Sequence, residues 1–187
     1  MSDYPVLPVI MPKDLTGIQN GRLPDNLLRK INNKGRLHHN AATAWNALQL
    51  AAYFAGVELL PISDPDTYRD YPKQEALFYA RYQQTPTDRQ PQVTRTFNGK
   101  TWYLKKGIAP AGTPGSSNHG WGLAVDVANA SGKRLEWLLA NAVKYGFTWE
   151  VKNGANAEAW HIRFVCGDTF PQAVLDAVAA FPQLDAR

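Results

Sequence analysis

Residues 117–126 are Ser117-Asn118-His119-Gly120-Trp121-Gly122-Leu123-Ala124-Val125-Asp126, a glycine-rich turn that leads into an alternating strand. His119 and Asp126 are seven positions apart, an odd number, so one straight strand would point them to opposite faces of a sheet. The glycines beside His119 favour a turn there, with the strand beginning near Leu123. We therefore expect His119 in the turn and Asp126 on a strand face whose small neighbours leave room for a ligand.

A second stretch, Glu158-Ala159-Trp160-His161, precedes another alternating segment. Glu158 and His161 are three positions apart, so in a straight strand their side chains would point to opposite faces. The Glu158 carboxylate therefore reaches the face of His161 only if the backbone bends between the two residues. Two imidazoles and one carboxylate, from His119, Asp126 and His161, are three ligands for a metal ion and leave a fourth position for water. That arrangement is typical of a catalytic rather than a structural zinc site.

The two blocks resemble the signature of a family of zinc peptidases of bacterial cell-wall peptides, the D-Ala-D-Ala carboxypeptidases and L-alanyl-D-glutamate endopeptidases. That signature is Ser-x-His-x-x-Gly-x-Ala-x-Asp followed later by Glu-x-Trp-His, and this chain fills every named position of it. A further family element, Tyr-Arg followed by a Gln, matches Tyr68, Arg69 and Gln74. The resemblance extends from about Tyr68 to about Phe164, and it implies an α+β fold with a small antiparallel sheet flanked by helices.

The resemblance also implies a Zn²⁺ cofactor held by His119, Asp126 and His161. Zinc lowers the pKa of its water from about 16 to about 7 and polarises the scissile carbonyl. Glu158 would then take the proton and deliver it to the leaving amine. Arg69 is the cation expected beside the negative charge that develops on the carbonyl oxygen.

Two further residues are candidates for substrate binding. Ser117 is expected to hydrogen-bond the substrate next to the metal, and Trp121 to form part of the cleft wall. His38 and His39 are the other two histidines of the chain. Because adjacent side chains rarely converge on one ligand, we expect both at the surface.

Two other functions fit part of this pattern. Two histidines and one carboxylate also form the metal site of non-haem iron oxygenases. A second carboxylate, Glu158, three residues before a ligand favours hydrolysis, and the chain lacks the many regular strands of a jelly roll. A zinc-stabilised wall-binding module without catalysis is the remaining alternative, and the presence of both Glu158 and Arg69 argues against it.

Within the peptidase interpretation, we favour an endopeptidase that cuts the peptidoglycan stem peptide at L-Ala-D-Glu and acts as a bacteriolytic endolysin. The alternative is a carboxypeptidase that removes terminal D-Ala. The preference rests on residues 1–5, where no basic region precedes an apolar stretch, so no secretory signal is expected. We therefore expect synthesis in the cytoplasm, release to the bacterial cell wall at lysis, and a monomer that binds the stem peptide.

Composition fits one zinc peptidase domain over residues 1–187, with 44% hydrophobic and 19% charged residues. The net charge of +4 is a mild excess without a clustered basic face, so nucleic-acid binding is not expected. No segment approaches the roughly 18 apolar residues of a membrane span, so no membrane insertion is expected. Cys166 is the only cysteine, which excludes an intrachain disulfide and an all-cysteine zinc site.

Residue spacing also predicts the elements around the two blocks. Residues 1–23 hold several prolines and glycines without a sustained period, and we expect an extended arm wrapped on the domain. Asn-Gly at 98–99 predicts a hairpin turn. Helical spacing predicts helices over residues 24–33, 41–55, 72–85, 132–145 and 171–181, and a short buried strand is expected over residues 57–62.

Overall fold

Helices and short antiparallel strands are mixed along the chain, which confirms the predicted α+β class. The computed structural model describes residues 3–31, 34–154 and 157–187. The helices are α1 (His39–Phe54), α2 (Tyr71–Arg81), α3 (Gly132–Asn141) and α4 (Gln172–Ala180). The strands are β1 (Leu28–Lys30), β2 (Arg36–His38), β3 (Tyr82–Gln83), β4 (Thr94–Phe97), β5 (Lys100–Leu104), β6 (Ala124–Asp126), β7 (Phe147–Thr148) and β8 (His161–Phe164). Short 3-10 helices are η1 (Lys13–Leu15), η2 (Asp25–Leu27), η3 (Asp64–Asp66), η4 (Asn118–Trp121), η5 (Ala142–Tyr145) and η6 (Pro182–Leu184).

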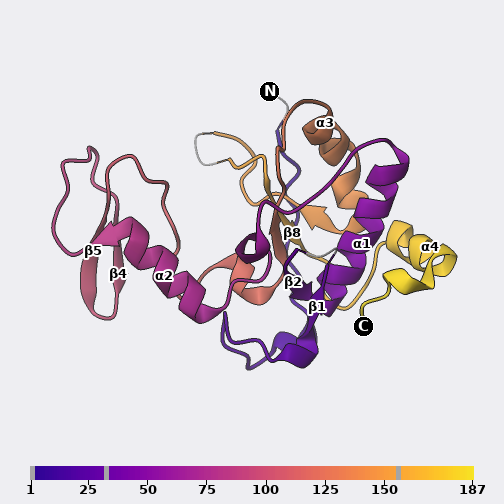
Figure 1. Cartoon of the computed structure of the whole chain (residues 1–187), viewed down its shortest axis with the longest axis horizontal. Coiled ribbons are helices and arrows are strands. Elements are labelled where there is room, and N and C mark those ends of the chain that lie inside the picture. Colours follow the sequence, from indigo (N-terminus) through magenta and orange to yellow (C-terminus); the bar gives the residue numbers. More distant parts are fainter. Residues whose placement is uncertain (1–2, 32–33, 155–156) are drawn as a thin grey trace.

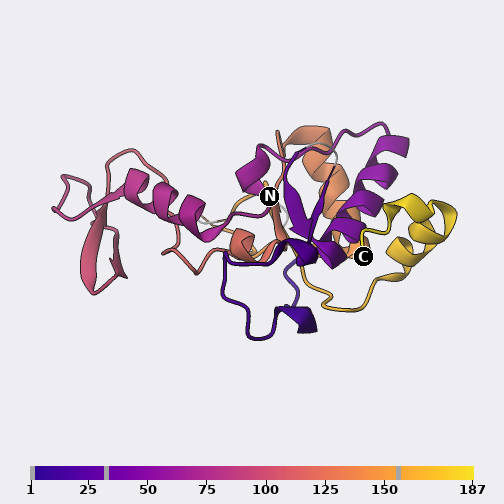
Figure 2. The same cartoon turned by 60° about the horizontal axis from the view of Figure 1, so that its bottom comes forward.

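In the described part of the chain the strands form three separate antiparallel sheets, in the orders β1-β2, β3-β5-β4 and β6-β8-β7. We call residues 82–113, with β3, β4 and β5, the lobe, and the remainder the body. Helix α2 leads out of the body and carries the lobe at its far end (Figure 1). The rotated view keeps the lobe well apart from α1, α3 and α4 (Figure 2). None of the helices in the described part of the chain is long and apolar enough to span a membrane.

Helix α1 lies at the centre of the main core. Trp45 and Leu48 of α1 are fully buried, and the Trp45 ring meets the edge of Phe147 at a centroid distance of 6.0 Å. Val125 of β6 and Ile162 of β8 are also fully buried, because alternate side chains of these strands point into the same core. The opposite face of β6 and β8 is therefore available for polar side chains.

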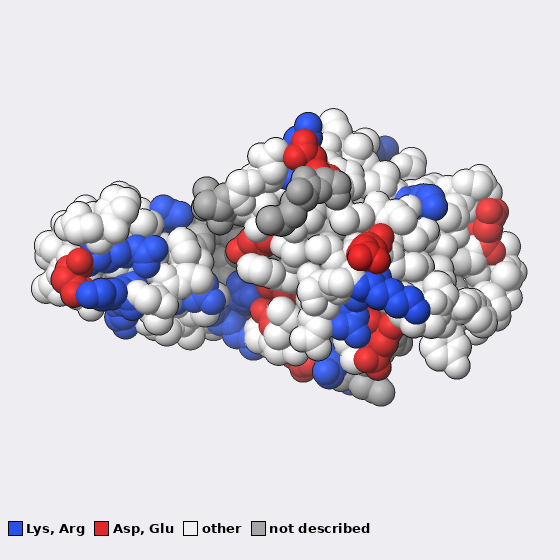
Figure 3. Space-filling view, turned by 90° about the horizontal axis from the view of Figure 1, so that it is seen from above, with Lys and Arg blue, Asp and Glu red and all other residues white. Residues whose placement is uncertain are grey.

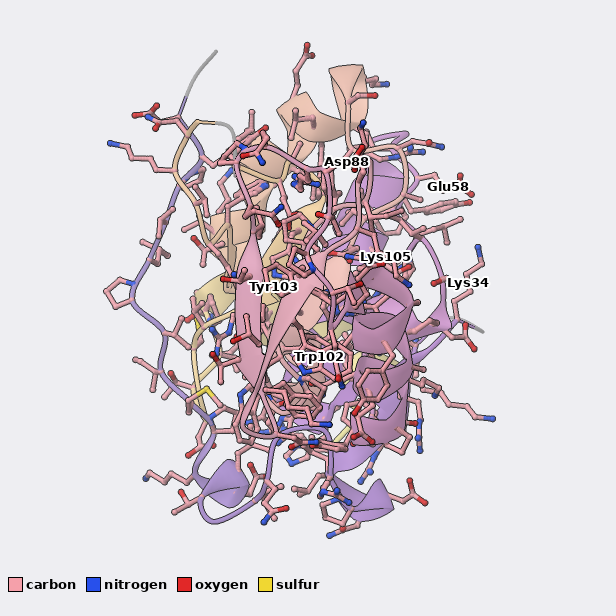
Figure 4. All side chains as sticks on the ribbon, turned by 90° about the vertical axis from the view of Figure 1, so that its left-hand side faces the viewer. Lys34, Glu58, Asp88, Trp102, Tyr103 and Lys105 are labelled. Carbon is pink, nitrogen blue, oxygen red and sulfur yellow. The ribbon has the colours of Figure 1, made fainter. Side chains whose placement is uncertain are left out.

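The lobe has a small core of its own. The hairpin between β4 and β5 turns at Asn98 and Gly99, both with positive φ (51° and 70°), which confirms the predicted turn. Trp102 and Tyr103 are neighbours on β5 in the lobe (Figure 4), and the side chain of Trp102 packs against the lobe core. The lobe core consists of Phe78, Tyr82, Phe97 and Leu104.

The N-terminal segment lies along the loop that follows β7. The backbone N–H of Trp149 donates to the carbonyl of Pro5 at 3.1 Å, and the ring of Tyr4 stacks on that of Trp149 at 5.4 Å. Of the predicted arm over residues 1–23, residues 1–2 lie outside the described residues. The described part of the arm thus supports a loop that leads toward Glu158.

The predicted helix over residues 24–33 is wrong. Among residues 24–31 only η2 is helical, and it is followed by β1, which pairs with β2 so that Leu28 faces His38. The apolar spacing of Leu28 and Ile31 fits a helical turn, but the pairing with β2 is a longer-range contact that local spacing does not reveal. The predicted helix end near Asn33 lies outside the described residues.

The predicted strand over residues 57–62 is reduced to a single bridge between Pro61 and Val127. Ile62 N–H still donates to the carbonyl of Asp126 at 2.9 Å, so the segment runs beside β6. Ala128 N–H likewise donates to the carbonyl of Leu60 at 2.8 Å, so the contact with β6 is limited to the residues on either side of Pro61.

Candidate metal centre and cleft

The turn before β6 positions His119. The turn is the 3-10 helix η4, and Gly122 follows it with φ 65°, a conformation that favours glycine. A Cβ atom on Gly122 would lie 2.7 Å from the backbone nitrogen of His38, so the turn also needs glycine for its close packing. The strand begins at Ala124 and ends at Asp126. The expected placement of His119 outside the strand is confirmed.

Strand β8 brings His161 opposite Asp126. The two residues are direct partners in the antiparallel pairing of β6 with β8, so their side chains leave the same face of the sheet. Glu158 precedes β8 in a turn in which the N–H of His161 donates to the carbonyl of Glu158 at 3.1 Å. The bend expected between Glu158 and His161 is therefore present.

His119, Asp126 and His161 converge on one point. Each offers one ligand atom, and these three atoms lie within 4.8 Å of one another. His119 Nε2 is 3.3 Å from Asp126 Oδ2, and His161 Nδ1 is 2.7 Å from Asp126 Oδ1. The cluster is mostly buried, with His119 5% and His161 9% exposed.

A backbone carbonyl determines which nitrogen of His119 carries its hydrogen. Thr67 O lies 2.9 Å from His119 Nδ1, and a carbonyl oxygen can only accept a hydrogen bond. Nδ1 therefore donates to Thr67, and Nε2 is the nitrogen that faces Asp126 and the metal position. Histidines that bind metals commonly have the ring nitrogen away from the metal fixed by such a bond.

His161 lies between two carboxylates. Its Nε2 is 3.3 Å from Glu150 Oε1, the atom that also accepts from the side-chain amide of Asn118 and lies 3.9 Å from Arg163 Nη1. Burial alone would lower the pKa of His161, but hydrogen bonds with Asp126 and Glu150 raise it to about 9. Burial alone would raise the pKa of Asp126, but hydrogen bonds from the two histidines hold that pKa well below its usual range.

The cluster fits a zinc ion. The 3.3 Å between His119 Nε2 and Asp126 Oδ2 matches the edge of a tetrahedron with metal–ligand bonds of about 2.0 Å. Two nitrogens and one oxygen are a donor set that zinc accepts in catalytic sites, and they leave one position for water or substrate.

A cleft of about 380 Å³ opens onto the cluster at the waist between lobe and body (Figure 3). Glu158 lies on its wall and is solvent-exposed, as expected for a group that exchanges protons with a substrate. Trp160 is 42% exposed and also lines it. The charged side chains in the lining are Asp66, Arg69, Arg81, Asp126, Glu150 and Glu158.

Arg69 is held rigidly at this cleft. Its Nε donates to the carbonyl of Pro65 at 3.0 Å, and its Nη2 lies 3.3 Å from Asp66 Oδ1. Its backbone N–H donates to the carbonyl of His119 at 3.0 Å. Burial lowers the pKa of Arg69, and the charge of Asp66 opposes this effect.

The two expected substrate-binding residues differ in position. Ser117 lines the cleft, and its hydroxyl has no hydrogen-bond partner among the described residues. Trp121 instead packs against the main core and is not part of the cleft lining. The structure therefore does not bring Trp121 to the expected cleft wall, and Trp160 occupies that wall.

The N-terminal arm supports the His119 turn. Asn20 Nδ2 donates to the carbonyl of Ser117 at 2.8 Å, and Asn20 Oδ1 accepts from Gln74 Nε2 at 3.0 Å. A Cβ atom on Gly120 would lie 2.0 Å from Asn20 Oδ1, so only glycine fits there. Gln74 Nε2 also lies 3.0 Å from the carbonyl of Arg69, which joins the arm, the turn and the start of α2.

The sequence analysis missed Glu150 and Thr67. A signal for Glu150 exists, because it is a charged residue directly after the buried run Phe147–Trp149, which contains two aromatic residues. Thr67 contributes through its carbonyl, which every residue type has, so no side-chain pattern could identify it.

The expectation for His38 and His39 is wrong. His38 is fully buried, and both rings converge on Asp14, with His38 Nε2 2.9 Å from Oδ1 and His39 Nε2 2.7 Å from Oδ2. His38 Nδ1 accepts from the N–H of Asn40 at 3.3 Å and so caps α1. Adjacent histidines converge here because one aspartate has two oxygens to offer.

A small antiparallel sheet that presents two histidines and an aspartate, beside a cleft with further carboxylates, is typical of a metallopeptidase. The sequence profile described as "VanY: D-alanyl-D-alanine carboxypeptidase" matches residues 34–167. The chain therefore belongs to this family, and it is a zinc-dependent peptidase that acts on peptidoglycan, as the motifs indicated.

Several solved structures are similar to this chain. VanYB in complex with D-alanine-D-alanine is 22% identical, with 83% of this chain and 82% of that chain covered and a TM-score of 0.47. The LdcB LD-carboxypeptidase is 22% identical, with 97% and 91% covered and a TM-score of 0.45. The L,D-carboxypeptidase DacB from Streptococcus pneumonia is 23% identical, with 88% and 81% covered and a TM-score of 0.44. No curated protein sequence matches the chain.

Proposed function

We propose that His119, Asp126 and His161 hold the zinc ion and that this centre hydrolyses one peptide bond of the peptidoglycan stem peptide. The observation that carries the proposal is the convergence of the three ligand atoms within 4.8 Å at a cleft that also contains Glu150 and Glu158. The non-haem iron alternative has the same three ligands but no need for these additional carboxylates.

Glu158 is the proposed proton carrier. Zinc, when bound, supplies a Lewis acid that acidifies water and polarises a carbonyl. The Glu158 carboxylate takes a proton from the attacking water and transfers it to the nitrogen of the leaving amine. Its exposed position on the cleft wall, one turn before His161, suits both transfers.

Arg69 is the proposed partner of the carbonyl oxygen. Its contacts with Pro65 and Asp66 fix the guanidinium before substrate binds, so little reorganisation accompanies the reaction. Removal of such a donor typically costs about 3–4 kcal/mol of transition-state stabilisation. Ser117, with its unbonded hydroxyl in the cleft, is the proposed hydrogen-bond donor to the substrate backbone.

Two bonds of the stem peptide are candidates. The family description favours the terminal D-Ala-D-Ala bond and thus a carboxypeptidase. The L-Ala-D-Glu endopeptidase reaction of an endolysin is the second candidate, because the cleft lies at a waist between lobe and body where a longer chain could pass (Figure 3). In either case we propose that the enzyme acts as a monomer on the cell wall.

Mass spectrometry of purified peptidoglycan fragments after digestion tests the proposal. Loss of one alanine identifies the carboxypeptidase, and a new N-terminal D-Glu identifies the endopeptidase. The Glu158→Gln variant should keep its zinc and lose cleavage by about 10²- to 10⁴-fold. Intact fragments with zinc-loaded wild-type protein would contradict the proposal, and unchanged activity of Glu158→Gln would remove Glu158 from the mechanism.

A further inference from the structure

Two arginines at opposite ends of α2 line the cleft. Arg69 lies two residues before the helix, and Arg81 is its last residue. Arg69 has Asp66 as a counter-ion. Arg81 has no carboxylate within 4.0 Å among residues 3–31, 34–154 and 157–187, so it is the cation of the cleft whose charge the described protein leaves unpaired.

The contacts of Arg81 hold it at the cleft without using all of its donors. Its Nη1 donates to the carbonyls of Ala109 (3.3 Å) and Pro110 (2.8 Å), on the loop that forms the lobe side of the cleft. Its Nε and Nη2 have no partner in the part of the chain that the structure describes. A guanidinium offers five N–H donors in a planar fork, so donors remain for a ligand.

Arg81 is also within electrostatic reach of the metal side of the cleft. Burial is the main cause of the lowered pKa of Arg69, Asp66 and Asp126 oppose it, and the positive charge of Arg81 adds to the lowering. The two guanidinium groups thus act on the same space, but among the described residues only Arg69 has a carboxylate partner.

The substrate supplies the missing negative charge. In a terminal D-Ala-D-Ala bond, the carbon attached to the scissile nitrogen carries the free carboxylate. In an L-Ala-D-Glu bond it also carries a carboxylate, because the stem peptide continues through the side-chain carboxyl of D-Glu. Such a group would enter a cleft lined by Asp66, Asp126, Glu150 and Glu158, and an arginine without a carboxylate partner beside it would offset their repulsion.

We propose that Arg81 binds the carboxylate on the leaving-group side of the scissile bond and so determines which peptides are cleaved. The proposal rests on the proposed function and names the subsite that selects its substrate. Arg69 then donates to the carbonyl oxygen, and Arg81 binds the carboxylate of the leaving residue. The two ends of α2 thereby recognise the two sides of one bond.

Paired substrates test this subsite. The peptide that the wild-type enzyme cleaves is compared with the same peptide carrying a carboxamide in place of that carboxylate. We expect wild type to prefer the carboxylate by roughly 10- to 100-fold in kcat/KM, the range of a hydrogen bond to a charged group. Arg81→Gln should lose this preference through a higher KM for the carboxylate peptide, with little change for the amide. Arg81→Lys should retain most of the preference.

Arg89→Gln is the matched control, because Arg89 Nη1 donates to the carbonyl of Ile108 at 3.1 Å in the same loop but does not line the cleft. It should leave the preference intact. If Arg81→Gln lost the same activity on both peptides, Arg81 would only stabilise the loop. The same conclusion would follow if Arg89→Gln had an equal effect on the preference. Equal cleavage of both peptides by wild type overturns the Arg81 subsite and leaves the proposed function standing. Cleavage of neither peptide overturns both.

Discussion

Two clusters in this molecule each contain two histidines and one aspartate, yet they are built for different purposes. In the cleft, His119 donates from Nδ1 to the carbonyl of Thr67, so Nε2 is left to face Asp126 and a metal ion. At the start of α1, His38 accepts at Nδ1 from a backbone N–H, so Nε2 keeps its hydrogen and donates it to Asp14. The same composition yields an open donor set in one place and a closed hydrogen-bonded cap in the other.

The difference shows that the hydrogen-bond partner of Nδ1, the ring nitrogen away from the aspartate, decides whether the histidine is suited to bind a metal. Both clusters place their ligand atoms within 4.8 Å, so distance alone does not separate them. A carbonyl behind the ring leaves a lone pair for a metal, whereas an N–H behind the ring uses that lone pair.

The largest effect is expected when one histidine is removed from each cluster. His161→Ala should reduce bound zinc from about one ion per chain to a small fraction and abolish cleavage, because two ligands hold zinc poorly. His39→Ala should retain both zinc and activity. Metal content by mass spectrometry and cleavage of stem-peptide fragments measure the two effects. Loss of zinc in His39→Ala would show that the second cluster also binds metal.

A second test concerns the carboxylate next to each cluster. Glu150→Gln should weaken zinc binding about 10- to 100-fold, because Glu150 orients His161 through Nε2. Excess zinc should restore its activity, which distinguishes it from Glu158→Gln. Asp14→Asn is the control in the other cluster and should leave the zinc affinity unchanged. If excess zinc fails to restore Glu150→Gln, Glu150 takes part in the chemistry itself.

A third test concerns the capping role of His38. His38→Ala should lower the free energy of unfolding by about 1 kcal/mol from the lost cap of α1, and further because a fully buried ring is removed. Urea denaturation measures the change. Zinc stoichiometry should stay the same, and a variant as stable as wild type would contradict the capping role.

The smallest expected effect is a pH dependence of stability. Burial lowers the pKa of His38, Asp14 and Asp168 raise it by their charges, and His39 lowers it further. The folded pKa thus lies below the unfolded value of about 6.5, so the unfolded chain binds more protons in that window. The contribution of His38 to stability should therefore fall as the pH drops from 7 toward 5. The slope should be shallower in His38→Gln, and an unchanged slope would mean that other groups cause it.

Much of the site was predictable because its information is local. Strand parity placed His119 in a turn and Asp126 on a strand, and the register of β6 with β8 confirms the pairing with His161. The helix expected over residues 24–33 failed, since β2 provides a partner that no local pattern contains. Trp121 was expected in the cleft wall, but it packs against the core.

The contributions of Glu150, Asn20 and Thr67 were not predictable from local sequence patterns. Glu150 reaches His161 from just past the end of the neighbouring strand β7, and Asn20 reaches the His119 turn from the N-terminal arm. Thr67 acts through its backbone. Each depends on a tertiary contact, which sequence spacing describes only within one element.

Helix α2 has a consequence beyond its place in the fold. It is one rigid rod of 11 residues between Arg69 and the lobe, and each residue advances a helix by about 1.5 Å and turns it by about 100°. The length of α2 therefore sets the distance between the groups at its two ends that contact a bound peptide. One inserted residue would swing the lobe around the helix axis, whereas a whole inserted turn would keep its orientation and lengthen the reach.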